Sequence, residues 1–333
     1  MNEIVRYLLQ SSVCLGALYL VYAMFLRQDT FFIMNRIYLL LVILFSITIP
    51  LVPVRFALET TMAPIVILLE PVLITPEKID ALTARHLSWV EAFGIVYLTG
   101  LIIFTIRFIV QVIQLMWVIH RNGITRHEKM NLVLVDKGYS PFSFFNLVFI
   151  RREVCGLADL SAILRHEQVH IRQRHSIDLI LAELLTIVLW FNPFSWLIQR
   201  SIKSLHEYLA DEGVLKCGIR KQDYQQLIFS QTLGKQLNNL TNNFNVSLIQ
   251  KRIIMMTKSR SNPAAKMKLM FALPVLLLTL FFFSSSTFSM LSAQDQTTKT
   301  NQLNANEKQF KSQQEKASQA DQEGNQLIPS TPR

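Results

Sequence analysis

The sequence predicts a mainly α-helical, polytopic membrane protein with four transmembrane helices and one cytoplasmic α+β domain. Of its 333 residues, 51% are hydrophobic and only 17% are charged, and the mean hydropathy is +0.31. Soluble domains contain roughly 25% charged residues. The chain nevertheless carries a net charge of +10. Its hydrophobicity excludes a disordered protein, and three cysteines provide no disulfide framework.

Four apolar stretches are long enough to cross a bilayer, which takes about 20 helical residues. They are Leu8–Leu26, Ile37–Val54, Ala92–Ile119 and Leu269–Leu291. Buried core helices are the alternative, but soluble cores rarely contain such uninterrupted runs. We therefore expect transmembrane helices 1 and 2 within residues 1–54, helix 3 over 92–119 and helix 4 over 269–291. Between them we expect an extracytoplasmic loop over 55–91 and a cytoplasmic domain over 120–268. A polar, disordered extracytoplasmic tail is expected over 292–333.

The distribution of charge predicts the orientation in the membrane. Residues 119–268 hold 21 Lys and Arg against 11 Asp and Glu, whereas residues 54–91 hold 3 against 5. Basic residues stay on the cytoplasmic side, so residues 119–268 are expected inside and both termini outside. Such a surface suits anionic membrane lipids. Nucleic acid is not expected as a direct partner, because no DNA- or RNA-binding motif accompanies the charge. Within the third stretch, Arg107 is expected to snorkel toward the interface.

The motif HEQVH at residues 166–170 is typical of a zinc site. Positions i and i+4 share one face of a helix, so His166 and His170 can bind one Zn²⁺. Glu167 lies one residue further round, where it can act as the general base on water. The alternative is a solvated helix face that contains two histidines by chance.

A third zinc ligand is expected in the segment LHEYLADE at residues 205–212. Glu207 and Asp211 are four residues apart and share a helix face, and Ala210 allows close helix packing. Glu207 is the candidate ligand, and Asp211 is the candidate acceptor for the second N–H of a zinc-bound histidine. The alternative for both residues is a solvated surface acid.

Residues 179–191 are nearly all apolar and resemble a fifth span. A crossing there would place Glu207 on the opposite side of the membrane from His166 and His170. The run is interrupted by Glu183 and broken at Asn192–Pro193, which leaves pieces that are too short to cross. We therefore expect a hydrophobic helix, a turn and the start of another helix.

Together, HEQVH, WFNPFSW at 190–196 and HEYLAD at 206–211 resemble the BlaR/MecR family of bacterial membrane antirepressor metallopeptidases. The resemblance implies a gluzincin-like metallopeptidase domain with zinc ligands at His166, His170 and Glu207 and the catalytic acid/base at Glu167. It also implies a multi-pass protein of the bacterial inner membrane. Its substrate would be a cytoplasmic protein, a winged-helix transcriptional repressor or the protease itself. A homodimer is left open.

Well-known members of that family carry a penicillin-binding sensor domain after the fourth span. The 42 residues after Leu291 are rich in Gln, Asn, Ser and Lys and contain neither S-x-x-K nor K-T-G. They are therefore not expected to form that sensor.

Two weaker predictions concern the surroundings of the metal. Residues 131–151 predict two short strands, Leu132–Val135 and Leu147–Ile150, whose edge would hold a substrate backbone or form only a structural hairpin. His175 and His206 are candidates for contact with the oxyanion or the substrate, although a structural role is the alternative.

Three other functions remain open from the sequence. A quality-control protease of the HtpX/Ste24 type has a similar motif pair and would cleave broadly. An intramembrane protease would place its motif in an apolar helix, whereas Arg165, Arg172 and Arg174 surround this one. A non-catalytic signalling adaptor would bind no zinc.

Overall fold

A computed structural model describes residues 2–51, 89–127, 130–136, 140–153, 160–236 and 243–281. The chain divides into two compact units. The first consists of Met1–Val52 and Ala63–Leu277, and it contains all the contacts discussed below. The second consists of Pro53–Met62 and Leu278–Arg333, of which only residues 278–281 are described.

The described part of the chain contains four helices that are long and apolar enough to cross a membrane: Glu3–Leu26, Phe32–Leu51, Glu91–Asn122 and Pro263–Phe281. The first is α1 (Asn2–Val21) with the π-helix η1 (Tyr22–Leu26), and the second is α2 (Phe32–Thr48) with η2 (Ile49–Leu51). The third is α3 (Trp89–Asn122), and the fourth begins as η6 (Pro263–Phe271). All four overlap the predicted stretches. Residues 52–54 and 282–291 of those predictions, and most of the predicted outer loop and the whole tail, lie outside the described residues.

Helix α3 exposes large apolar side chains along its length. Phe93, Ile102, Ile113 and Trp117 are each more than half exposed. Helices on the surface of soluble proteins carry polar residues on their outer face. The apolar outer face of this 34-residue helix therefore indicates that its outward side contacts lipid.

Four strands form one sheet in the order β1-β2-β4-β3. They are β1 (Thr125–His127), β2 (Met130–Val135), β3 (Phe142–Phe144) and β4 (Leu147–Arg151). The two predicted strands are present as β2 and β4, but they pair in parallel, with Leu132 opposite Val148. The alternative of a hairpin between them is therefore wrong. The parallel pairing is possible because β3 takes the chain back and pairs antiparallel with β4 at the sheet edge.

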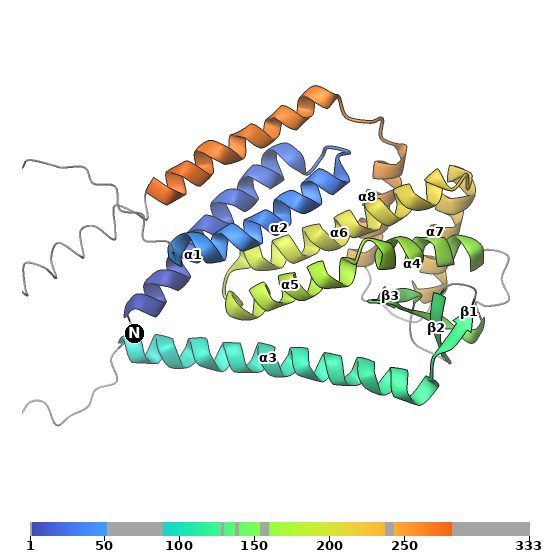
Figure 1. The fold of residues 1–333 in the computed structure, drawn as a ribbon, viewed down its shortest axis with the longest axis horizontal. Coiled ribbons are helices and arrows are strands. Elements are labelled where there is room, and N and C mark those ends of the chain that lie inside the picture. Colours follow the sequence, from blue (N-terminus) through green and yellow to red (C-terminus); the bar gives the residue numbers. More distant parts are fainter. Residues whose placement is uncertain are drawn as a thin grey trace, which may run out of the picture. The chain divides into compact units, whose positions relative to one another are not determined.

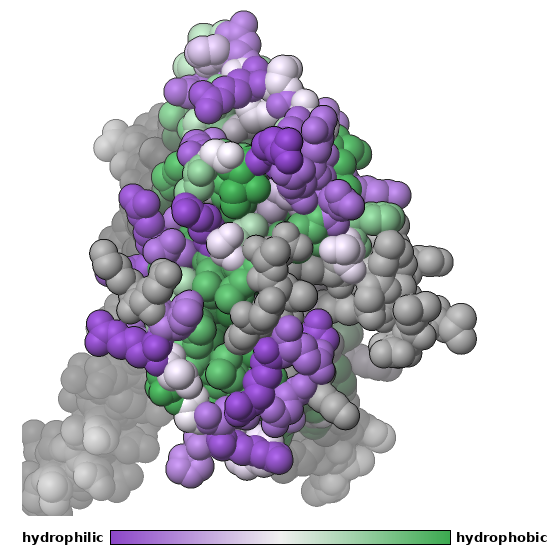
Figure 2. Space-filling model, turned by 90° about the vertical axis from the view of Figure 1, so that its right-hand side faces the viewer, coloured by the Kyte–Doolittle hydropathy of each residue, from purple (hydrophilic) through white to green (hydrophobic). Residues whose placement is uncertain are grey.

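Helix α3 packs against one face of the sheet. Five further helices pack against each other: α4 (Leu160–Arg172), α5 (His175–Val188), α6 (Pro193–Lys216), α7 (Lys221–Gln236) and α8 (Asn243–Thr257). Of these, α4 packs against the other face of the sheet. Ile163 and Leu164 of α4 join Leu132, Val148 and Ile150 in a buried cluster. The end of the molecule with the sheet, α4 and α7 is largely hydrophilic at its surface, with hydrophobic residues in between (Figure 2).

The apolar run 179–191 forms a helix and a turn, as predicted. Helix α5 has 14 residues, which is too short to cross a bilayer, and it ends at Val188. Asn192 caps α6 by accepting a hydrogen bond from the Phe194 N–H, and Pro193 occupies the first turn. Helices α5 and α6 then lie side by side, and α6 also packs against α1 and α2 (Figure 1).

Arg107 does not snorkel as predicted. Its Nη2 lies 2.5 Å from Glu183 Oε1 of α5, and Gln199 of α6 also donates to Glu183. An acid within reach on a neighbouring helix gives the guanidinium a partner inside the protein, so it has no need to extend toward the interface.

Candidate metal centre

Helix α4 presents the two histidines of HEQVH on one face. One helical turn separates them, and their Nε2 atoms lie 3.2 Å apart. The helix ends at Arg172, and Arg174 adopts a left-handed conformation with φ 54°. This conformation stops the helix and allows α5 to start in a new direction.

Helix α6 brings Glu207 to these histidines. Ala210 is fully buried. Gly213 faces α4 so closely that an added Cβ would lie 2.5 Å from Cγ2 of Val169. Small residues on this face of α6 therefore permit the short distance between the two helices.

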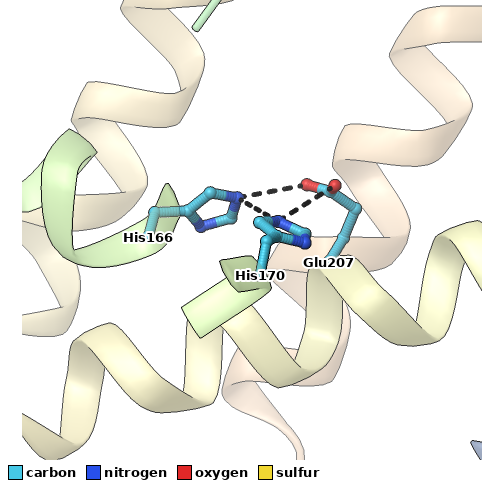
Figure 3. Close-up of side chains that lie close together, drawn as sticks. All are labelled: His166, His170 and Glu207. Atoms are coloured by element: carbon cyan, nitrogen blue, oxygen red, sulfur yellow. Dashed lines mark hydrogen bonds and ion pairs between the residues drawn. The ribbon is translucent and has the colours of Figure 1, made fainter. Parts of the chain in front are cut away.

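Three side chains that can bind a metal ion converge between α4 and α6 (Figure 3). Glu207 Oε2 lies 3.5 Å from His166 Nε2, and Glu207 Oε1 lies 3.7 Å from His170 Nε2. Within the described residues, His166, His170 and Glu207 form a group whose ligand atoms all lie within 4.8 Å of one another. Glu207, which follows His170 by 37 residues in the chain, is thus brought to the two histidines, as the sequence predicted.

The donor set fits a zinc ion. Ligand atoms at about 2.0–2.2 Å from a tetrahedral metal stand roughly 3.3–3.5 Å from one another. The spacings of 3.2–3.7 Å between the three side chains are close to this. Two imidazoles and one carboxylate also leave a fourth position open, as in catalytic zinc sites.

The electrostatics favour a neutral His170 and an ionised Glu207. Burial, and after it the neighbouring His166, lowers the pKa of His170 to about 3. Burial alone would raise the pKa of the Glu207 carboxyl, but His166 and the Arg252 guanidinium hold that pKa well below its usual range. A neutral imidazole and a carboxylate are the forms that bind metal ions.

Glu167 lines the same cavity as the histidines and is only 5% exposed. Burial raises the pKa of its carboxyl above the usual value. A carboxylate with a raised pKa is a stronger base, so it suits proton transfer near neutral pH.

A cavity of about 520 Å³ opens onto these side chains. One wall is the segment Ser140–Ser143, which leads into β3 at the edge of the sheet. The opposite walls come from α6, α7 and α8. Its apolar lining includes Phe142, Ile163, Leu227, Ile228, Leu248 and Ile249.

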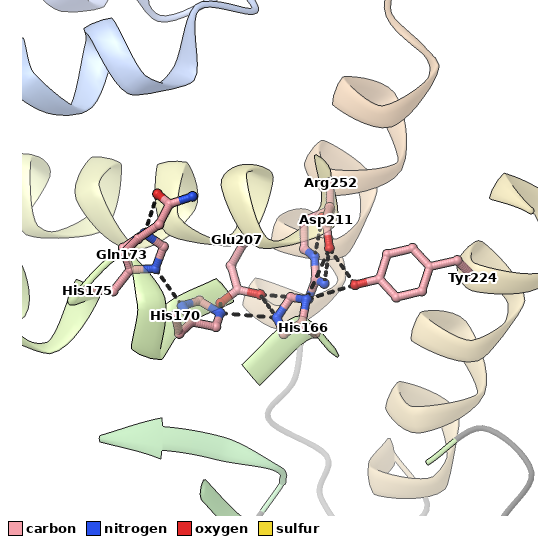
Figure 4. Close-up of polar contacts among 8 residues, drawn as sticks. All are labelled: His166, His170, Gln173, His175, Glu207, Asp211, Tyr224 and Arg252. Atoms are coloured by element: carbon pink, nitrogen blue, oxygen red, sulfur yellow. Dashed lines mark hydrogen bonds and ion pairs between the residues drawn. The ribbon is translucent and has the colours of Figure 1, made fainter. Parts of the chain in front are cut away.

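Beside His166, the hydroxyl of a tyrosine contacts both the histidine and its predicted acid (Figure 4). His166 Nδ1 is 3.6 Å from Asp211 Oδ1, too far for a hydrogen bond. Tyr224 of α7 fills the gap, since its hydroxyl donates to Asp211 Oδ1 at 2.8 Å and lies 2.8 Å from His166 Nδ1. Because the single phenolic proton goes to Asp211, His166 Nδ1 is the donor to the tyrosine oxygen.

Arg252 of α8 pairs with two acids of α6, Asp211 and Glu207. Its Nε and Nη2 donate to Asp211 at 2.9 and 2.5 Å, and its Nη1 lies 2.8 Å from Glu207 Oε2. Asp211 is 1% exposed. The guanidinium therefore balances two carboxylates that would otherwise repel each other.

His175 lies behind His170. The two Nδ1 atoms are 2.7 Å apart, and His175 is 2% exposed. His206 lines the cavity but is also 2% exposed, and its Nε2 lies 2.7 Å from Asp178 Oδ2. The position of His175 suits orientation of a ligand, whereas that of His206 leaves the predicted substrate contact open.

The sequence gives no local signal for Tyr224 or Arg252. Each is an isolated residue on a helix whose other residues fit ordinary packing, and each reaches the site only because α7 and α8 fold back onto α6.

Residues 157–256 match the family model described as BlaR1 peptidase M56. The chain is also 28% identical over 139 residues to Regulatory protein BlaR1 of Staphylococcus aureus. The match covers 39% of this chain and 22% of that relative, so it spans about a fifth of the relative's length.

The matched segment contains α4, α5, α6, α7 and most of α8, which are the helices that carry the convergent side chains. Residues 157–256 are therefore similar to M56 peptidases of the BlaR1 type, and the resemblance to the BlaR/MecR family that the motifs predict is confirmed in this segment.

Proposed function

We propose that this chain is a membrane-embedded zinc metalloendopeptidase whose active site faces the cytoplasm. The observation that carries the proposal is the convergence of His166, His170 and Glu207 within a peptidase-type segment. His166 and His170 would supply two imidazole ligands and Glu207 the carboxylate ligand. Asp211 would hold His166 through Tyr224.

A zinc ion at this position would act as a Lewis acid toward the scissile carbonyl and toward water. Glu167 would accept the proton of the attacking water and pass it to the leaving amine. Its burial and raised pKa support both transfers. The edge of β3 would hold the substrate backbone by strand addition beside the cavity.

The proposed orientation places residues 120–268 in the cytoplasm, with four spans, the N-terminus outside and the tail outside. The excess of basic residues in 119–268 supports this arrangement. The helices that carry the site also form no further span between His166 and Glu207.

The proposed role is signal transduction. The similarity to a protein named as regulatory supports it. The substrate would be a cytoplasmic winged-helix transcriptional repressor, and the protease would also cleave itself.

The proposal is tested with the full chain in detergent and with a Glu167→Gln variant. Zinc content is measured by elemental analysis, and cleavage is followed with a winged-helix repressor and with β-casein as an unrelated unfolded protein. We expect Glu167→Gln to retain zinc and to lose about 10²–10⁴-fold in cleavage rate. Glu212→Gln is the matched control, because Glu212 lies on α6 but pairs with Lys216.

Cleavage by Glu167→Gln at the unaltered rate would contradict the mechanism. Absence of zinc from the unaltered chain would favour the non-catalytic adaptor. Equal cleavage of the repressor and of β-casein would favour a quality-control protease.

A further inference from the structure

Arg36 lies near the start of α2, a helix long and apolar enough to cross a membrane, yet its guanidinium points into the peptidase segment. Its Nε donates to Asp178 Oδ2 at 2.6 Å. Its Nη2 donates to the main-chain carbonyl oxygen of Gln173 at 2.7 Å, and its Nη1 donates to the side-chain Oε1 of Gln173 at 3.2 Å. One side chain of α2 therefore holds both the turn after α4 and the first turn of α5.

These contacts fix the orientation of the Gln173 amide. An arginine side chain has only donors, so the side-chain atom of Gln173 that faces Arg36 must be the amide oxygen, Oε1. The same Oε1 lies 3.2 Å from His175 Nε2. His175 must therefore carry its proton on Nε2.

The tautomer of His175 in turn sets that of His170. His175 already carries its proton on Nε2, toward Gln173, so its Nδ1 is the acceptor. That Nδ1 lies 2.7 Å from His170 Nδ1, which must then be the donor. His170 is left with a bare Nε2, the atom that faces His166 and Glu207.

A second set of contacts keeps the His175 ring in place. It stacks on His206 with ring centroids 3.9 Å apart and an interplanar angle of 6°. His206 Nε2 lies 2.7 Å from Asp178 Oδ2, the oxygen that also accepts from Arg36. His175, His206 and Asp178 are at most 4% exposed, so water does not compete for these bonds.

We infer that Arg36 is a positioning residue that acts through Gln173 and His175 to present Nε2 of His170 to the metal. The inference rests on the proposed function, because it assumes that His170 is a ligand. It adds that a helix outside the matched peptidase segment determines the geometry of a ligand. A shift of α2 relative to α5 changes metal binding without moving any ligand directly.

The test uses the full chain in detergent and the variants Arg36→Met and Gln173→Leu. Zinc affinity is measured by chelator competition, and the visible absorption of the Co²⁺-loaded protein reports ligand geometry. We expect both variants to bind zinc about 10–100-fold more weakly, the usual effect of losing a residue that orients a ligand. The Co²⁺ spectrum should change in both.

Two further variants separate positioning from stability. Gln173→Glu keeps an acceptor oxygen between Arg36 and His175, so its zinc affinity should return close to that of the unaltered chain. Arg107→Met removes another ion pair between an apolar helix and α5, that with Glu183, but has no path to His170. It should lower the melting temperature and leave zinc affinity unchanged.

Unaltered zinc affinity and an unchanged Co²⁺ spectrum in Arg36→Met and Gln173→Leu would overturn the inference and leave the proposed function standing. An equal loss of affinity in Arg107→Met would also overturn it, because the effect would then be general. If the unaltered chain binds no zinc, the proposed function fails and the inference fails with it. If Arg36→Met does not fold, Gln173→Leu alone decides.

Discussion

The single hydroxyl of Tyr224 contacts the partly buried His166 and the buried Asp211. It accepts from His166 Nδ1 and donates to Asp211. In a Tyr224→Phe variant both would lose this partner, since 3.6 Å is too long for a direct bond between them. We expect zinc affinity to fall about 10–100-fold. The free energy of unfolding should fall by about 1–3 kcal/mol, the cost of an unsatisfied buried polar group.

Chelator competition and thermal unfolding of the two proteins would measure these changes. Tyr97→Phe is a suitable control, because the Tyr97 hydroxyl also donates one hydrogen bond, to the Val188 carbonyl oxygen. Tyr97 is far from the histidines in the chain and does not contact them. An unchanged zinc affinity in Tyr224→Phe would show that His166 needs no orienting partner.

The residues that could be predicted from the sequence are those whose relation is local. His166 and His170 share one helical turn, and Glu207 and Asp211 share another, so their spacing alone indicates a common face. Tyr224, Arg252 and Arg36 reach the same centre from three other helices. Their spacing in the chain carries no information about this, because only tertiary packing brings them together.

The contact between helices α4 and α6 depends on Gly213. In a Gly213→Ala variant the new Cβ would lie 2.5 Å from Val169 Cγ2, so the Val169 side chain or the two helices would have to shift. The higher helix propensity of alanine favours the variant by about 1 kcal/mol, whereas overpacking costs about 1–3 kcal/mol. We therefore expect little change or a modest loss in stability, with weaker zinc binding because His170 and Glu207 separate.

The double variant Gly213→Ala/Val169→Ala provides the matched control, because it removes the methyl groups that clash. Zinc affinity measured by chelator competition should recover in the double variant. If Gly213→Ala alone binds zinc as tightly as the unaltered chain, helix separation does not control the ligand geometry.

Elements were predictable where their own sequence determines them. The apolar run 179–191 could be assigned to a helix and a turn because Asn192–Pro193 both stops the run and caps α6. The pairing of β2 with β4 could not be predicted, since parallel pairing depends on the chain reversal at β3. The partner of Arg107 could not be predicted either, because Glu183 lies 76 residues further along the chain.

Taken as a whole, the molecule separates its apolar and basic parts. Four apolar helices hold the stretches with few charges, and the basic excess falls in residues 119–268 with all the convergent side chains. Arg36 and Arg107 are exceptions to this separation, and both pair with acids of α5. Ion pairs therefore connect α2 and α3 to the segment that carries the site.

The orientation of the whole chain can be tested with a cysteine that is already present. Cys217 follows α6 and is exposed. If residues 120–268 face the cytoplasm, a membrane-impermeant maleimide should leave Cys217 unlabelled in intact spheroplasts and label it after permeabilisation. A cysteine introduced at Thr75, in a Cys217→Ser background, should show the opposite and react without permeabilisation. No apolar helix long enough to cross a membrane separates Cys217 from Glu207 on α6. Labelling of Cys217 in intact spheroplasts would therefore place the metal centre and its substrate outside the cell.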